Sequence, residues 1–375
     1  MSDITLSSGI RQNLLSLQQT AADLTTTQEA LATGKAVNSA ADNPSAYFTS
    51  QNLTNTANSL SALLDQIGQG QQTIDAATNG LTSITSLLQQ TLSTVQQAQQ
   101  ASQTAGSTTG TVNLSGGAPS LNTLTIAVGA ITSSVTITSG ETLSAIETAI
   151  NGTSGLGSSG AVTASDNGTE LVLTANSGST SFTLGGSGQT ALGLSGTAVY
   201  GTSSTRTTLQ SNYNGLLTQI TELAGDSGYN GVNLLNGNSL TINFNPTGTS
   251  SLTITGVTFN ASGLGLSSVS GAGAGSFQDN SATGLTALVT DLNSAITSVQ
   301  TQTETFGTNS GVIGTRQTFE TNMINTLQTG ASNLVVADQN QESADLLTEQ
   351  TQQQLEISAL SIANQANQSV LKLFG

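Results

Sequence analysis

Seven apolar residues recur at every seventh position through a long stretch of this chain that contains no proline. They are Leu53, Leu60, Ile67, Ile74, Leu81, Leu88 and Val95. An apolar period of seven predicts a long helix whose seam packs on other helices. Such a helix would extend to about residue 100 and measure roughly 70 Å. Gly68, Gly70 and Gly80 lie inside it and each cost about 1 kcal/mol relative to alanine, so we expect the helix to need neighbours.

The C-terminal half of the chain carries a matching pattern. Its seven-residue ladder consists of Leu285, Leu292, Val299, Phe306 and Ile313, and the helix is expected to continue through Phe319, Met323, Leu327 and Leu334. The partners of the first helix can come only from this half of the chain or from another subunit. Two helix-rich halves of this kind indicate a subunit that builds a polymer.

Both ends of the chain predict amphipathic helices. The first is expected over residues 4–33, with one stripe formed by Ile10, Leu14, Leu17, Ala21, Leu24 and Leu31. The last has an eleven-residue rhythm, which implies little or slightly right-handed supercoiling, and its stripe is Leu355, Ala359, Ile362, Ala366, Val370 and Leu373. We interpret both stripes as self-assembly surfaces; an intramolecular core is the alternative.

Between the helical halves, residues 104–203 are rich in Gly, Ser and Thr. Short alternating apolar runs predict strands there, around Leu124, Ile126, Val128, Val135, Ile137, Leu171 and Leu173. Leu143, Ile146 and Ile150 have helical spacing. The sequence therefore predicts a small β-rich domain with one helix.

Helical spacing returns over residues 209–223, and a hairpin follows. Leu240, Ile242 and Phe244 alternate with polar residues, a turn is expected at residues 245–248, and alternation resumes to about residue 254. The length of 375 residues fits two or three domains.

Composition excludes most functional classes. The chain has no Cys, no His and no Trp, and only 7% of its residues are charged, against about 25% in soluble domains. Thiolate nucleophiles, imidazole bases and common zinc sites are therefore excluded. We predict no catalytic residue, no cofactor and no metal site, hence no enzyme. Absence of Cys also permits passage through a narrow export channel in an unfolded state.

The charge balance limits the partners. The net charge is −16, and the five basic residues lie singly along the chain, which argues against binding to nucleic acid. No run of about 18 apolar residues predicts a membrane span, and residues 1–20 lack the pattern of a cleaved signal peptide.

Four carboxylates share one face of the predicted C-terminal helix. They are Asp338, Glu342, Asp345 and Glu349. A solvated face is the simplest interpretation. Contact with Arg316 or Arg11 of a neighbouring subunit is the main alternative. Metal binding is disfavoured because no glycine-turn calcium loop surrounds these residues.

Four segments, in the same order, resemble bacterial flagellins. Residues 31–44 (LATGKAVNSAADNP) resemble the connector that follows the first flagellin helix, and residues 229–235 (YNGVNLL) resemble a turn segment of that family. Residues 360–371, beginning LSIANQANQ, resemble its terminal helix. Residues 124–184 are similar to a β-rich repeat inserted in flagellins and filament-capping proteins.

The resemblance implies an α+β fold in which long N- and C-terminal helices form a coiled-coil-like rod with an inserted β-rich outer domain. Residues 1–34 and 336–375 would form an inner layer of terminal helices, and residues 35–52 a connector. Residues 53–103 and 204–335 would form the rod with its hairpin, and residues 104–203 the outer domain. The insertion would precede the second N-terminal rod helix.

The resemblance also implies function and partners. The protein would be secreted unfolded and would polymerise through its terminal helices into the extracellular flagellar filament used for swimming. Its expected partners are other flagellin subunits, the flagellar type III export apparatus, an export chaperone that binds the C-terminus, and hook-associated and capping proteins. A hook-filament junction protein is the nearest alternative. An adhesive or O-glycosylated outer domain stays open as an additional role. The zinc-protease insert of some flagellins is excluded because it needs His.

One segment departs from flagellins that the animal Toll-like receptor detects. Those proteins carry arginine in the rod helix, whereas residues 88–95 read LQQTLSTV here. The resemblance to flagellins of some alphaproteobacteria therefore implies weak or no recognition by this receptor.

Overall fold

The structure, a computed structural model, describes residues 8–156, 161–176, 181–194, 198–280 and 283–374. The side chains of residues 198, 367 and 370–374 lie outside this description. The chain divides into two compact units. The terminal unit comprises Met1–Gly68, Ile242–Leu252 and Ile313–Gly375, and the central unit comprises Gln69–Thr241 and Thr253–Val312.

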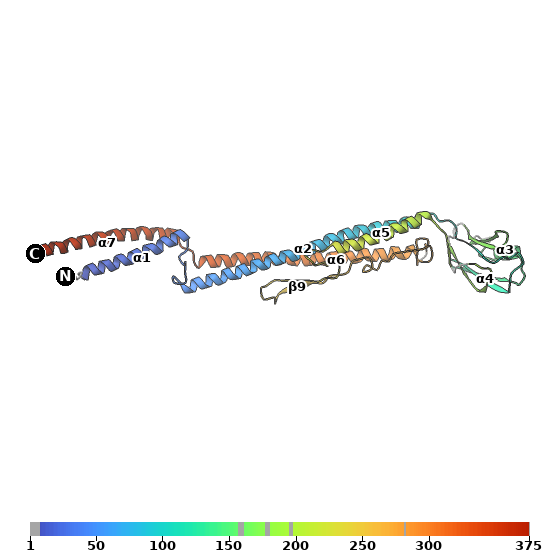
Figure 1. The fold of residues 1–375 in the computed structure, drawn as a ribbon, viewed down its shortest axis with the longest axis horizontal. Coiled ribbons are helices and arrows are strands. Elements are labelled where there is room, and N and C mark those ends of the chain that lie inside the picture. The colour runs from blue at the N-terminus through green and yellow to red at the C-terminus, as the bar shows by residue number, and fades with distance from the viewer. Residues whose placement is uncertain (1–7, 157–160, 177–180, 195–197, 281–282, 375) are drawn as a thin grey trace. The chain divides into compact units, whose positions relative to one another are not determined.

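In the terminal unit, α1 (Ser8–Thr33) and α7 (Gln339–Phe374) run side by side in opposite directions (Figure 1). Their contacts define this direction, because Thr20 bonds to Glu356 whereas Thr27 bonds to Glu349. An antiparallel bridge between Lys35 and Val336 follows the end of α1.

A short turn leads from α1 into the next helix. The carboxylate of Asp42 accepts hydrogen bonds from the backbone N–H groups of Ser39 at 2.8 Å and Asn38 at 2.9 Å. These two bonds lower the pKa of Asp42 because they stabilise its charged form. The Asn-Ser-x-x-Asp segment of the sequence thus forms its own hydrogen-bonded turn.

Helix α2 (Pro44–Gln100) begins earlier than the apolar ladder alone predicted. Asn43 caps it by accepting a hydrogen bond from the N–H of Ala46 at 3.1 Å, and proline is favoured at the first helical position. The predicted connector of residues 35–52 is therefore partly helical. The ladder marks where the seam starts at Leu53, whereas the cap decides where the helix starts.

The terminal unit also contains the first part of α2 and the last part of α6 (Leu285–Asn333). These segments are antiparallel, and the hydroxyl of Ser50 donates to the carbonyl of Ala331 at 2.9 Å. Leu60 and Ile67 of α2 and Ile313 of α6 are buried. These three members of the two ladders are therefore shielded from solvent.

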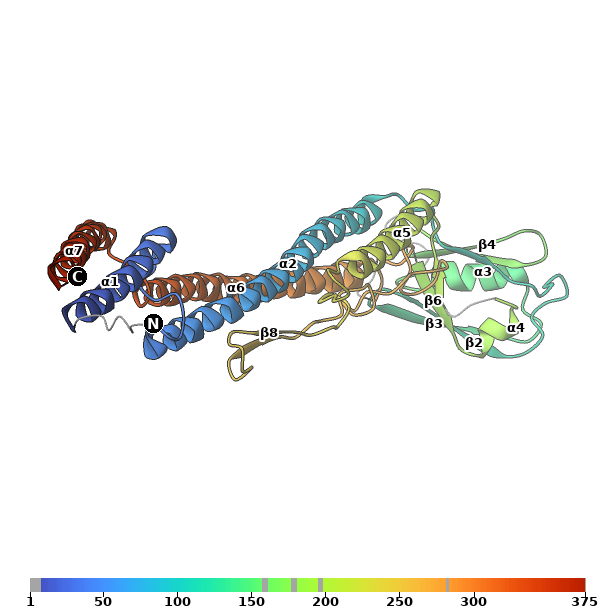
Figure 2. The same cartoon turned by 60° about the vertical axis from the view of Figure 1, so that its left-hand side comes forward.

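The central unit contains the later part of α2, the first part of α6 and α5 (Ser204–Asp226), which lie alongside one another (Figure 2). The amide of Gln71 in α2 bonds to Ser310 of α6 at 2.8 Å. Helix α5 covers the predicted residues 209–223 and buries Tyr213, Leu217 and Ile220.

The β-rich region of the central unit follows α2. One sheet has the strand order β1-β5-β4 and the other β3-β2-β6-β7, and neighbouring strands in both sheets are antiparallel. The strands are β1 (Ser107–Thr109), β2 (Asn122–Val128), β3 (Ile131–Ile137), β4 (Val162–Asp166), β5 (Leu171–Ala175), β6 (Ser181–Gly185) and β7 (Ala198–Tyr200). Two helices accompany them, α3 (Leu143–Gly152) and α4 (Ser187–Ala191).

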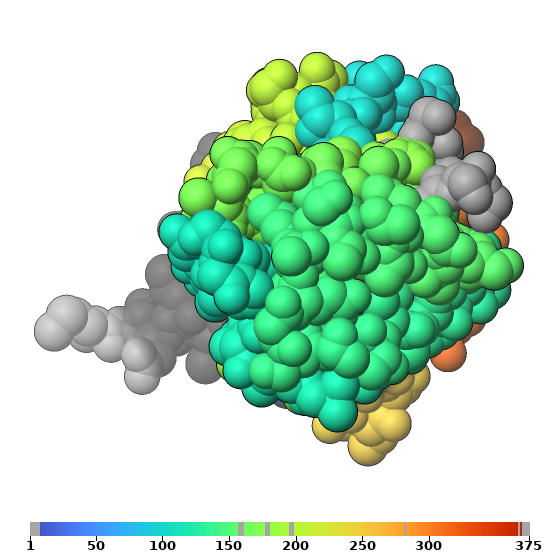
Figure 3. Space-filling view, turned by 90° about the vertical axis from the view of Figure 1, so that its right-hand side faces the viewer, coloured from blue at the N-terminus to red at the C-terminus, as the bar shows by residue number. Residues whose placement is uncertain are grey.

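The predicted apolar residues form the core of this region. Buried side chains alternate along β2 and β5, and Ile146 and Ile150 of α3 pack into the same cluster. Figure 3 shows the face of the region that carries its turquoise and green segments. The predicted strands around residues 124–137 and 171–173 and the predicted helix around residue 146 are confirmed.

The predicted hairpin is formed by β8 (Leu240–Asn243) and β9 (Ser251–Ile254). At its turn the N–H of Phe244 donates to the carbonyl of Ser250 at 2.7 Å, and Gly248 has a φ of +71°, which suits glycine. The tip, Ile242–Leu252, belongs to the terminal unit. Among the helices that the structure describes, none is both long and apolar enough to cross a membrane.

Candidate assembly surfaces

The pair formed by α1 and α7 has a seam with steps of three and four residues. The seam residues are buried or half-buried, and they are Ile10, Asn13, Leu17, Thr20, Leu24, Thr27 and Leu31 of α1 with Leu346, Glu349, Gln353, Glu356, Leu360 and Ala363 of α7. Four of the five α1 residues predicted for self-assembly thus pack within the subunit. Leu14 is the exception, with 39% of its surface exposed.

The middle of this seam is polar. One oxygen of the Glu356 carboxylate accepts hydrogen bonds from the hydroxyls of Ser16 at 2.7 Å and Thr20 at 3.2 Å. One oxygen of Glu349 accepts from the hydroxyl of Thr27 at 3.1 Å. Within the described residues, the second oxygen of each carboxylate is buried without a hydrogen-bond partner. Glu349 and Glu356 lie seven residues apart, so one face of α7 presents both to α1.

The four carboxylates of the predicted acidic stripe, Asp338, Glu342, Asp345 and Glu349, therefore differ in their exposure to solvent. Glu349 lies in the seam and Glu342 is half-buried, whereas Asp345 is exposed. Asp338 accepts a hydrogen bond from the N–H of Asn340 at 2.9 Å at the start of α7. The interpretation of one solvated face was thus wrong for Glu349. Sequence reasoning also missed Glu356, although its seven-residue spacing from Glu349 was a usable signal.

The predicted apolar stripe of α7 lies on a different face. Leu355 is 65% exposed and Ile362 is 66% exposed, and neither belongs to the seam with α1. Leu347 and Ile357 add further exposed apolar surface to this helix. The side chains of Val370 and Leu373, predicted for the same stripe, lie outside the described residues. Exposed apolar surface on one helix is typical of a face that contacts another molecule.

The side chains predicted for rod packing are buried or half-buried. Leu53 is half-buried. The others are buried, and they are Leu60, Ile67, Ile74, Leu81, Leu88, Val95, Leu285, Leu292, Val299 and Phe306. These buried side chains are not available on the outer surface of the helices.

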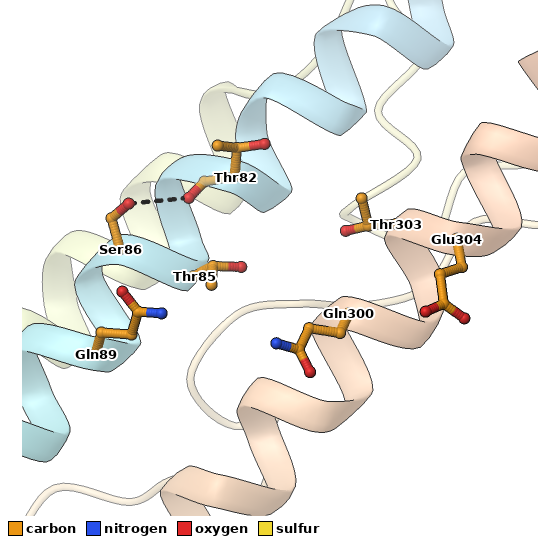
Figure 4. Close-up of a pocket in the computed structure, with 7 residues that line it drawn as sticks. All are labelled: Thr82, Thr85, Ser86, Gln89, Gln300, Thr303 and Glu304. Atoms are coloured by element: carbon orange, nitrogen blue, oxygen red, sulfur yellow. Dashed lines mark hydrogen bonds between the residues drawn. The ribbon is translucent and has the colours of Figure 1, made fainter.

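An open polar groove of about 720 Å³ lies between α2 and α6 in the central unit (Figure 4). It is lined by Thr82, Thr85, Ser86, Gln89, Gln300, Thr303 and Glu304. The side chains are hydroxyls and amides with a single carboxylate, and the Ser86 hydroxyl is already bonded to the carbonyl of Thr82. Glu304 supplies the one carboxylate of the groove, and no imidazole or thiol lines it. The groove therefore offers polar contacts from hydroxyls, amides and one carboxylate.

A buried arginine, which sequence reasoning passed over, holds the base of the β-rich region. Arg206 of α5 is 2% exposed, and burial lowers its pKa. Its guanidinium donates to the carbonyls of Ala101 at 3.1 Å and Phe277 at 3.2 Å, and to the side chain of Asn280 at 3.1 Å. A further bond reaches the carbonyl of Gln99 at 3.4 Å. A cation near the C-terminal carbonyls of α2 is also favoured by the helix dipole.

The chain segments next to Arg206 are tied together as well. The hydroxyl of Thr104 donates to the carbonyl of Thr202 at 3.0 Å, and the amide of Gln103 donates to the carbonyls of Gly201 and Gln278. We call residues 101–104 and 201–206 the neck. The two chain segments of the neck are thus hydrogen-bonded to each other and to the loop that precedes α6.

Comparisons with known proteins agree with this architecture. A family model described as the bacterial flagellin N-terminal helical region matches residues 8–115, and one described as the bacterial flagellin C-terminal helical region matches residues 289–374. Together they cover just over half of the chain.

Individual relatives match a shorter stretch. Over 88 residues the chain is 40% identical to flagellin FljN, 38% to flagellin FljO and 39% to flagellin FljM, all of Caulobacter vibrioides. Each match covers 24% of this chain and 32% of the relative. The chain therefore spans about a third of the length of the curated relatives that it matches.

Proposed function

Because the chain belongs to the bacterial flagellin family, we propose that it is a structural subunit of the flagellar filament. The subunit would be exported, would polymerise outside the cell and would serve swimming motility. The main support is the exposed apolar face of α7, where Leu355 and Ile362 are both about two thirds exposed. A filament would bury this face between subunits, and that burial would supply most of the assembly free energy.

Assembly would be coupled to ordering of the terminal helices. The seam between α1 and α7 contains Thr20, Thr27, Glu349 and Glu356, so it buries less apolar surface than an all-apolar coiled coil would. Such a pair gains stability when neighbouring subunits cover it. In this proposal the inner layer comprises residues 1–34 and 336–375, the rod residues 53–103 and 204–335, and the outer domain residues 104–203.

The proposed partners correspond to the successive steps of export and assembly. The type III export apparatus would pass the unfolded chain, which has no Cys and hence no disulfide. An export chaperone would cover the C-terminal helix before assembly, and hook-associated and capping proteins would bound the filament at its two ends. The exposed apolar residues of α7 suit a chaperone that masks them.

Weak or absent recognition by the Toll-like flagellin receptor is a further part of the proposal. In the segment of residues 88–95 the exposed positions carry glutamine and serine, and no basic side chain is present. Purified monomer should therefore give little response in receptor reporter cells. Strong signalling at concentrations that suffice for a responsive flagellin would contradict this part alone.

Assembly is tested by changing the exposed face of α7. The double variant Leu355→Gln, Ile362→Gln should remain soluble with its β-rich region folded. It should fail to form filaments when salt is added to induce assembly. The matched control changes two exposed polar residues of the same helix, Ser358→Asn and Ser361→Asn, and should assemble. Filaments of normal length from the glutamine variant would rule out this surface.

A larger deletion tests the same idea. Removing residues 355–375 should leave soluble protein without polymerisation. Electron microscopy of the assembled full chain separates the filament subunit from its alternative, because a hook-filament junction protein would not grow into long smooth filaments on its own.

A further inference from the structure

The seven-residue ladder of α6 contains one charged member. Counting onward from Leu285, Leu292, Val299, Phe306 and Ile313, the next position is Glu320, and this residue is only 3% exposed. Ile313 before it and Ile324 after it are buried too. A carboxylate at such a position is costly in its charged form because it is removed from water.

The surroundings of Glu320 offer little compensation. Within the described part of the chain, its carboxylate makes no hydrogen bond and no ion pair. Burial raises its pKa, and the nearby charge of Arg316 opposes that rise only in part. The α2 segment of the terminal unit brings Tyr47 and the exposed Asp65, and the hairpin tip brings no titratable side chain. Arg316 is therefore the charged group that bears on Glu320.

Arg316 is engaged elsewhere. Its guanidinium carbon lies 5.1 Å from the ring centroid of Phe244 in the hairpin tip, and Phe244 is 6% exposed. A guanidinium at this distance over an aromatic ring is attracted by the ring quadrupole. Arg316 and Glu320 are also four residues apart on one helix, which is the spacing at which side chains of opposite charge can pair. The arginine thus has two possible partners within its reach.

We propose that Arg316 and Glu320 form a switch that docks or releases the hairpin tip according to the protonation of Glu320. When the carboxyl is neutral it fits the apolar seam, and Arg316 covers Phe244. When the carboxyl loses its proton to solvent, the buried negative charge draws Arg316 away from Phe244 and into an ion pair. The tip then loses the side chain that covers its aromatic ring.

The direction of the pH dependence follows from linkage. Because the folded protein raises the pKa of Glu320, the docked arrangement is fully present below the ordinary glutamate value of 4.5 and is lost as pH rises through the higher folded value. The hairpin tip should accordingly be more mobile at neutral pH than in mild acid. The switch lies within one subunit, so it does not depend on the proposed assembly.

A single tryptophan at position 244 reports on this switch, because the chain has no other. The Phe244→Trp variant is titrated from about pH 4 to about pH 8, and its emission should shift to longer wavelength in one step as the indole becomes exposed. Adding Glu320→Gln should remove that step and hold the short-wavelength emission throughout. The matched control adds Glu304→Gln, an exposed glutamate of the same helix, and should keep the step.

Hydrogen exchange provides a second readout without the tryptophan. After correction for intrinsic rates, amides of residues 242–252 should exchange faster at neutral pH than in mild acid in the natural chain, and equally at both pH values in Glu320→Gln. The proposal is overturned if the step in emission survives Glu320→Gln, or if the pH dependence of tip exchange is the same in both proteins.

Discussion

The hydroxyl of Thr27 in α1 donates a hydrogen bond of 3.1 Å to the carboxylate of Glu349 in α7. The pair lies inside the seam of the two terminal helices, where an all-apolar coiled coil would have two aliphatic side chains. One level further along, Thr20 and Glu356 repeat the arrangement. Polar pairs at seam positions specify register, so these contacts define which α1 residue meets which α7 residue.

The Thr27–Glu349 contact leads to a test by paired substitution. Thr27→Val should weaken the pairing of α1 and α7 by about 1 kcal/mol because it removes the donor to a partly buried carboxylate. The double variant Thr27→Val, Glu349→Leu should recover most of that loss, since both partners become apolar. Amide hydrogen exchange of α1 measures the effect. Thr26→Val at an exposed neighbouring position is the control, and an equal loss there would refute the specific role of Thr27.

Two glycines of α2 should respond in opposite ways to alanine. At Gly68 a Cβ would meet no atom within 4 Å, so Gly68→Ala should stabilise the helix by up to about 1 kcal/mol. At Gly80 a Cβ would lie 2.1 Å from the Oγ of Ser227 and 2.8 Å from Leu235. Gly80→Ala should therefore destabilise the protein by about 1–3 kcal/mol through overpacking. Denaturant unfolding compares the two, and stabilisation at both sites would contradict the close approach.

The stability of the neck should depend on the planar guanidinium of Arg206 and not only on its positive charge. Arg206→Lys keeps a cation but cannot reach the carbonyls of Ala101 and Phe277 together with Asn280, because an ammonium lacks the planar fork. We expect a loss of about 2–3 kcal/mol, since buried carbonyls are left unpaired.

Limited proteolysis checks the neck directly, because a loosened neck exposes residues 101–104 and 201–203 to cleavage. Arg11→Ala, at an exposed arginine of α1, is the control and should leave the cleavage pattern unchanged. Protection equal to the natural chain in Arg206→Lys would show that charge alone suffices.

Tyr213 provides a pH-dependent prediction in the alkaline range. Burial, with a smaller contribution from the negative charge of Asp291, raises the pKa of Tyr213 to about 12, and its hydroxyl donates to the carbonyl of Ser267 at 3.2 Å. Because the folded value lies above the ordinary value of 10.0, the stabilisation is complete below pH 10 and is lost as pH rises towards 12.

Ultraviolet titration of tyrosinate ionisation tests this assignment. Tyr213→Phe should remove the ionisation step at the highest pH. Tyr229→Phe, which alters a more exposed tyrosine bonded to Gln69, is the control and should leave that step in place. An unchanged high-pH step in Tyr213→Phe would contradict the buried position of this phenol.

Local chemistry and periodicity predicted much of this architecture. The seven-residue ladders placed α2 and α6, the alternating runs placed β2, β3 and β5, and the Asn-Pro-Thr-Gly segment placed the turn of the hairpin. These predictions succeeded because helix and strand geometry fix which residues share a face, whatever lies opposite. The start of α2 was misjudged, since residues 44–52 are helical without contributing to the ladder.

The sequence by itself determined which residues form stripes, but only the tertiary structure decided which stripe each helix uses internally. Ile10, Leu17, Leu24 and Leu31 pack against α7, whereas Leu355 and Ile362 face away from α1. The tertiary structure also placed Glu320, Glu349 and Arg206 in partly or fully buried sites, which their charge argued against. The physical reason is that burial depends on the element packed opposite. Distant residues supply hydrogen-bond partners for Arg206 and for one oxygen of Glu349, whereas Glu320 has only Arg316 of its own helix as a charged neighbour.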